Sequence, residues 1–175
     1  MVDELEATYL NKKPIIRNFS KAKVNIVLKI ADLKKDDEIL DFGCGAGWLK
    51  NKLKNEGYNI KGYDTTSEHS DIENYVELSP NKIFVLDVFE HIPKEEILKI
   101  VRNFKKMNQN IELIIAIPTE NLISRKARKL LGKSERVSDH ITTLNEILEI
   151  LNSELTFVKK FNFLGVSYIA KFKNN

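Results

Sequence analysis

An apolar stretch that ends in an acid and then breaks into glycines at every second position constrains this chain more than any other feature. The segment reads Ile39-Leu40-Asp41-Phe42-Gly43-Cys44-Gly45-Ala46-Gly47-Trp48-Leu49. Glycine permits a positive φ and a close approach of the backbone that a Cβ would block. The segment therefore predicts a tight turn between a strand and a helix beginning near Trp48, of the kind that holds a nucleotide-like ligand.

The spacing of these glycines argues against a dinucleotide site. Such a site needs the pattern G-x-G-x-x-G, in which the third glycine lets the helix pack closely on the strand. Counted from Gly43 and Gly45, that third position is Trp48, the bulkiest side chain available. An NAD-type site is therefore disfavoured.

The segment instead matches Asp-x-Gly-x-Gly-x-Gly over residues 41–47, and two further segments follow it in order. Residues 58–64 form a second predicted strand that ends in Asp64, and residues 81–93 form an apolar strand that runs into Asp-Val-Phe-Glu-His-Ile. Together these motifs resemble the class I S-adenosylmethionine-dependent methyltransferases of small-molecule type. The resemblance covers roughly residues 35 to 120 well and implies S-adenosylmethionine as the cofactor.

The resemblance also implies roles for individual residues. The glycine loop holds the cofactor, Asp64 accepts hydrogen bonds from its ribose diol, and the segment after the family's fourth strand passes beside its adenine and methionine parts. Asp71 or Glu73 could contact the adenine amino group. The implied cofactor-binding residues are Asp41, Gly43, Cys44, Gly45, Gly47, Asp64, Asp71, Leu86 and Asp87.

One departure from the family lies after Asp64. Family members place a helix and a third strand before the fourth strand, and here residues 65–80 leave too little room for both. We expect the helix to be lost, with residues 75–78 forming at best a short edge strand.

Alternating helix and strand patterns predict an α/β fold, a three-layer α/β/α sandwich with a Rossmann-like, mostly parallel sheet. The resemblance adds an antiparallel last strand. We expect one domain over 1–175, with a helical cover (1–34) and a core (35–175). The remaining elements are predicted as a helix over 20–33, a helix after Pro93, a strand over 111–117, a helix after a capping box at Thr143, and strands over 155–161 and 166–172.

Composition is that of a folded domain, since 42% of residues are hydrophobic and 30% are charged. No apolar run approaches a membrane span and no N-terminal charged-then-apolar segment suggests export, so a cytoplasmic location is expected. One cysteine excludes a disulfide framework, and three scattered histidines predict no metal site. Cys44 lies in the glycine loop, so no separate cysteine is left for attack on a pyrimidine ring.

His91 is the first candidate for a catalytic base and His140 the second, because imidazole titrates near neutral pH. His91 follows the strand end where substrate should approach, and His140 resembles a histidine before the late helix of many relatives. Each has a structural alternative: Glu90 and His91 could cap the turn before Pro93, and His140 could be held in a loop by Asp139.

The acceptor is less constrained. Methyltransferases of exocyclic amines on bases or glutamine carry Asn or Asp followed by Pro-Pro and an aromatic residue, whereas this chain has Leu86-Asp87-Val88-Phe89. Residues 122–136 hold six basic residues against the single acid Glu135. This segment could attract an anionic substrate, or it could be a solvated helix face. The candidate substrate-binding residues are Glu90, Arg125, Arg128 and Lys129.

These observations predict methyl transfer to oxygen, carbon or nitrogen of a small acceptor, with an anionic acceptor among the options. Two alternatives stay open. The short region after Asp64 could mark a binding or regulatory module without turnover. A nucleic-acid methyltransferase is less favoured, because the basic segment lacks interleaved aromatic residues.

Overall fold

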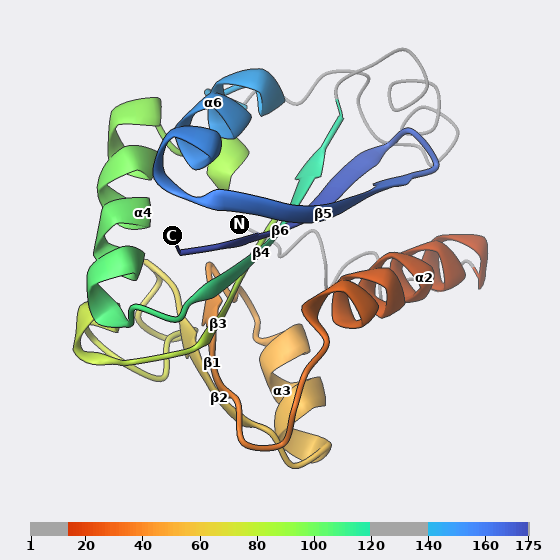
Figure 1. Ribbon diagram of the computed structural model, residues 1–175. Helices are drawn as coiled ribbons and strands as arrows, with labels where there is room; N and C mark the ends of the chain where they lie inside the picture. Colours follow the sequence, from red (N-terminus) through yellow and green to blue (C-terminus); the bar gives the residue numbers. More distant parts are fainter. Residues whose placement is uncertain (1–13, 120–139, 175) are drawn as a thin grey trace.

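A computed structural model describes residues 14–119 and 140–174. Within them, six strands form one sheet in the order β2-β1-β3-β4-β6-β5 (Figure 1). Strands β1 (Glu38–Phe42), β2 (Asn59–Tyr63), β3 (Lys82–Leu86) and β4 (Glu112–Pro118) run parallel. Strand β6 (Ser167–Lys173) runs antiparallel to both β4 and β5 (Thr156–Phe163). The mostly parallel sheet with an antiparallel last strand is confirmed.

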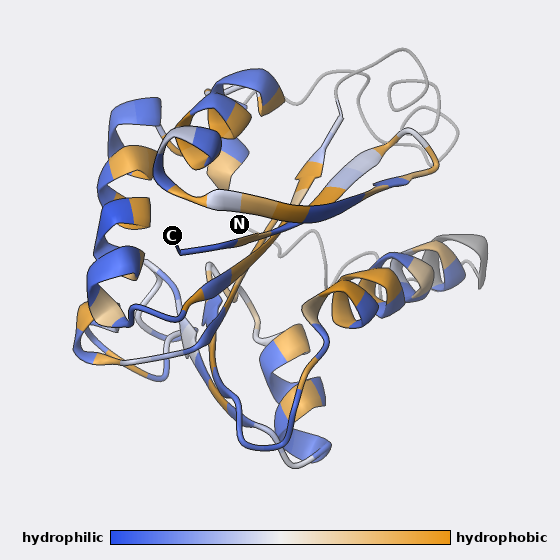
Figure 2. Ribbon diagram, viewed as in Figure 1, coloured by the Kyte–Doolittle hydropathy of each residue, from blue (hydrophilic) through white to orange (hydrophobic). Residues whose placement is uncertain are grey.

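Helices cover both faces of this sheet, which gives the predicted three layers (Figure 1). Helices α2 (Pro14–Ala31) and α3 (Trp48–Asn55) lie on one face, and α4 (Lys94–Met107) and α6 (Leu144–Glu154) lie on the other. Figure 2 shows hydrophobic residues along the central parts of the strands. In β3, Ile83 and Val85 pack toward α4 and α6, whereas Phe84 and Leu86 pack toward α2 and α3. Both faces of the central strands are therefore buried.

Local signals place the helix ends as the sequence predicts. Helix α6 begins with a capping box in which the Thr143 hydroxyl accepts the Glu146 N–H and the Glu146 carboxylate accepts the Thr143 N–H. Helix α4 begins directly after Pro93, and Gly57 ends the turn after α3 with a φ of 81°. The N-terminal helix begins earlier than the predicted residue 20. None of the described helices is long and apolar enough to span a bilayer.

The segment after Asp64 departs from the prediction in one respect. No α-helix forms over residues 64–81, as expected, but residues 75–77 form a 3-10 helix, η1 (Tyr75–Glu77), and not an edge strand. The Tyr75 ring packs edge-on against Phe42 and Phe104, with centroids 5.0 and 5.8 Å apart, and its hydroxyl accepts a hydrogen bond from Asn103 at 3.1 Å. These contacts draw the segment over the face of the sheet, so β2 remains the edge strand.

A buried ion cluster ties α2 to the sheet at the edge where β4 begins. Glu112 pairs with Lys82 and, at 2.7 Å, with Lys171. Both lysines also donate to the Ala31 carbonyl at the end of α2, at 3.3 and 3.4 Å. Burial would raise the pKa of Glu112, but the Lys171 and Lys82 ammonium groups outweigh it and hold that pKa below its ordinary value.

We expect Glu112→Gln to destabilise the fold by about 1–3 kcal/mol, because it leaves two buried ammonium groups without their carboxylate. The folded-state pKa lies below the unfolded one, so the stabilisation is complete above the unfolded value of about 4.3 and is lost as the pH falls through the folded one. Urea denaturation should therefore show that the free energy of unfolding of the wild type exceeds that of Glu112→Gln at pH 7. This difference should shrink toward pH 3.5. The exposed Glu149→Gln is the matched control, and an equal loss there would contradict the prediction.

Candidate active site

The glycine loop after β1 takes the left-handed backbone conformation that glycine adopts freely. Gly43, Gly45 and Gly47 have φ values of 75°, 49° and 78°. The N–H groups of Gly43 and Cys44 both donate to the Tyr63 carbonyl at the end of β2, at 2.8 and 3.1 Å. A Cβ at Gly43 would lie 2.5 Å from Cγ2 of Val88, so the loop also lies directly against the segment after β3. The loop is thus fixed to both neighbouring strands.

Asp64 and the glycine loop form one unit. The Asp64 carboxylate accepts the Gly45 N–H and the Thr66 N–H, each at 2.9 Å. A pocket of about 530 Å³ opens beside it, within the size range of small-molecule sites. The pocket is lined by Tyr63, Asp64, Thr65, Ser67, Ser70, Asp71, Ile72 and Glu73.

Cys44 and Asp71 both form hydrogen bonds within the protein that hold the glycine loop and its neighbours together. The Cys44 thiol donates to the His69 carbonyl at 3.4 Å, and burial, followed by the Asp41 charge, raises its pKa to about 12. It is therefore a poor nucleophile. Asp71 accepts the Gly62 N–H and pairs with Lys50, both at 2.9 Å. Burial would raise the pKa of Asp71, but the hydrogen bonds from Gly62 and Lys50 outweigh burial and lower that pKa. An adenine contact by Asp71 or Glu73 stays a prediction.

The strand end after β3 is tied to the N-terminal helix. Asp87 has a φ of 55° and accepts two hydrogen bonds from Nζ of Lys23 on α2, at 2.5 and 2.7 Å. No sequence signal separates Lys23 from the other lysines of its helix, so this partner was missed. Leu86 is buried against α2 and α3, and Asp41 is buried in β1, only 4% exposed. Their predicted cofactor contacts remain untested.

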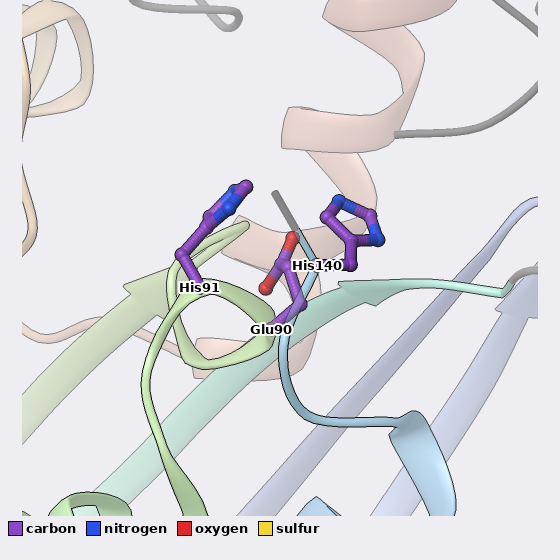
Figure 3. Close-up of side chains that lie close together, drawn as sticks. All are labelled: Glu90, His91 and His140. Carbon is purple, nitrogen blue, oxygen red and sulfur yellow. The ribbon is translucent and has the colours of Figure 1, made fainter. Parts of the chain in front are cut away.

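The two candidate histidines, predicted separately, come together. His91 ends the 3-10 helix η2 (Phe89–His91), and His140 precedes α6; their ring centroids are 5.0 Å apart. The Glu90 carboxylate lies between the two rings (Figure 3). Glu90 is buried, with 2% of its surface exposed. The predicted substrate-binding residues Arg125, Arg128 and Lys129 lie outside the described residues.

Comparison with known proteins identifies the family of this chain. A family model described as a methyltransferase domain matches residues 15–152. The chain belongs to this methyltransferase family. The predicted class I S-adenosylmethionine-dependent methyltransferase, with S-adenosylmethionine as its cofactor, is confirmed. No curated protein sequence matches this methyltransferase.

Solved structures share the methyltransferase fold at low identity. The PH0226 protein from Pyrococcus horikoshii OT3 is 13% identical, with a TM-score of 0.70, and the match covers 97% of this chain and 96% of that one. Magnesium protoporphyrin IX methyltransferase (ChlM) from Synechocystis PCC 6803 is 15% identical, with a TM-score of 0.65 and coverage of 97% and 92%. A SAM-dependent methyltransferase from Archaeoglobus fulgidus is 15% identical, with a TM-score of 0.63 and coverage of 97% of each chain.

Replacement of Gly43 tests the close approach in this methyltransferase. We expect Gly43→Ala to cost more than about 1 kcal/mol, because the left-handed conformation disfavours a Cβ and Val88 occupies its space. Val88→Ala in the same chain should recover the steric part of this cost and leave the conformational part. A double-mutant cycle by denaturation measures the coupling. Additive effects of the two substitutions would contradict the contact.

Replacement of Asp64 tests the predicted ribose contact. Calorimetry with S-adenosylhomocysteine should show micromolar binding by the wild type and binding about 10- to 100-fold weaker in Asp64→Ala, the range expected for hydrogen bonds to a charged group. Asp64→Asn keeps an oxygen for the Gly45 N–H and so separates loop support from charge. Glu56→Gln, at an exposed position before β2, is the control. Wild-type binding by Asp64→Ala would remove Asp64 from the cofactor site.

Proposed function

We propose that this methyltransferase transfers a methyl group to a nucleophilic atom of a small molecule held beside Glu90, His91 and His140. The observation that carries this proposal is the convergence of these three polar side chains. Glu90 and His91 lie a few residues beyond Asp87, which directly follows the central strand β3. His140 joins them from the segment before α6. Asp64 and the glycine loop lie at the same edge of the parallel sheet. The proposal assigns the loop side to the cofactor and the histidine side to the acceptor.

The chemistry required of this chain is positioning and removal of a proton. S-adenosylmethionine supplies an activated methyl group, so the cofactor carries the difficult bond. In-line alignment of the acceptor can lower the barrier by about 7–11 kcal/mol, whereas assistance with the proton contributes about 10²- to 10⁴-fold in rate. The two imidazoles and the Glu90 carboxylate supply groups for the smaller of these effects. Alignment of the acceptor therefore accounts for the larger share of the rate enhancement.

The acceptor proposed is a small molecule whose nucleophile carries a proton, such as a hydroxyl, carboxylic acid or thiol. The absence of the Pro-Pro-aromatic motif after residue 87 disfavours exocyclic amines of bases. The similar Synechocystis structure is named for magnesium protoporphyrin IX, which supports a small-molecule acceptor. The basic residues over 122–136 support an anionic one from the sequence alone. Neither the module without turnover nor the nucleic-acid enzyme gains a specific observation.

The test is a turnover assay with acceptors of these classes, in which the formation of S-adenosylhomocysteine is measured. We expect His91→Ala and His140→Ala each to lower kcat by about 10²- to 10⁴-fold, while the affinity for S-adenosylhomocysteine changes less than about twofold, well inside one tenfold step of 1.4 kcal/mol. The exposed Lys99→Ala on α4 is the control. Full turnover in both histidine variants would exclude this cluster from the acceptor side.

A further inference from the structure

The Glu90, His91 and His140 cluster has the composition of a metal site. Each residue offers one ligand atom, two imidazole nitrogens and one carboxylate oxygen, and all three atoms lie within 4.8 Å of one another. Figure 3 shows the carboxylate between the two rings, with all three side chains extending to the same side of the backbone. The rings are inclined by 76°, so they are not stacked on each other.

The spacing is close to what a bound cation requires. Metal–ligand bonds of about 2.0–2.2 Å place tetrahedral ligand atoms roughly 3.3 Å apart. Rotations of the two rings and of the Glu90 carboxyl group would have to close the remaining gap. The geometry is therefore that of a site in which rotations of these side chains separate the three ligand atoms from coordination distance.

The backbone beneath the cluster is held in place by hydrogen bonds. The N–H groups of Ile141 and Thr142 both donate to the Glu90 carbonyl, at 2.7 and 3.2 Å, and the Thr142 hydroxyl donates to the Ile92 carbonyl at 2.6 Å. The capping box at Thr143 then starts α6 immediately after this contact. Two segments far apart in the sequence are thus held side by side, and the backbone that carries the three ligands is preorganised.

We propose that Glu90, His91 and His140 bind one divalent transition-metal ion, which in turn holds an oxygen of the methyl acceptor. Two imidazoles and one carboxylate suit zinc, manganese, iron or cobalt, whereas magnesium and calcium prefer oxygen ligands. Burial of Glu90 strengthens its attraction to a cation, because the local dielectric is low. The sequence predicted no metal, since only the fold brings two of the three scattered histidines together.

The ion's remaining positions are left for the acceptor. Asp87, the nearest other acid on this segment, is engaged by Lys23. Three protein ligands leave a catalytic ion open for substrate. This use of the ion rests on the proposed function, with the three side chains assisting loss of the proton as ligands of the ion and not as free bases. A hydroxyl oxygen on the ion loses its proton to water, and its electron pair forms the bond to the methyl carbon. The carbon–sulfur bond breaks toward sulfur, and the ion is neither oxidised nor reduced.

Cobalt(II) is the probe, because its visible absorption reports imidazole and carboxylate ligation directly. The full-length protein, stripped with EDTA and titrated with Co²⁺ or Zn²⁺, should bind about one ion per chain, as three convergent ligands form one site. His91→Ala, His140→Ala and Glu90→Gln should each weaken Co²⁺ binding at least about tenfold, that is 1.4 kcal/mol or more. His69→Ala, at the chain's third histidine, should bind as the wild type does. Circular dichroism melts establish that each variant is folded.

Several outcomes would overturn the site: no saturable Co²⁺ or Zn²⁺ binding, unchanged binding in both His91→Ala and His140→Ala, or an equal loss in His69→Ala. Turnover that survives EDTA would overturn the ion's role in holding the acceptor. S-adenosylhomocysteine calorimetry on the same samples separates the two proposals. Cofactor binding without metal binding removes this site alone, whereas metal binding without methyl transfer removes the proposed function and the ion's role in it but leaves the metal site.

Discussion

The parallel pairing of β1 with β2 on one side and with β3 on the other is the constraint on which the site depends. Phe42 lies opposite both Tyr63 and Val85, so the three strands end within one residue of one another. The residues that follow them, Gly43, Asp64 and Asp87, therefore emerge at one edge of the sheet. The hydrogen bonds from the loop to the Tyr63 carbonyl and to Asp64 are consequences of this register.

The shortened segment after Asp64 serves two purposes at once. Its first part lines the pocket beside Asp64, and its last part closes the core through the Tyr75 ring. Tyr75 thereby covers apolar surface on the face that α4 and α6 share, in place of a longer helix. The sheet can end at β2 because this cover keeps Phe42 and Phe104 buried.

Two sets of contacts from charged side chains hold α2 against the sheet. At its C-terminal end the Ala31 carbonyl accepts from Lys82 and Lys171, which also pair with Glu112. At the middle of the helix, Lys23 pairs with Asp87 beside the site. The helix predicted to cover the core is thus linked to the strand end that precedes the Glu90, His91 and His140 cluster. The proposed acceptor side and the proposed cofactor side share this strand.

The sequence by itself determined what depends on neighbouring residues: the glycine turn, the capping box at Thr143, the helix start after Pro93 and the candidate residue types at positions 64, 91 and 140. These signals are local because φ, caps and periodicity depend on residues a few positions apart. The tertiary structure alone decided the partners. Lys23 and Asp87 are 64 positions apart. His140 lies beside His91 because the backbone N–H groups that follow it donate hydrogen bonds to the Glu90 carbonyl. Such contacts leave no spacing in the sequence, since they arise from how strands and helices pack.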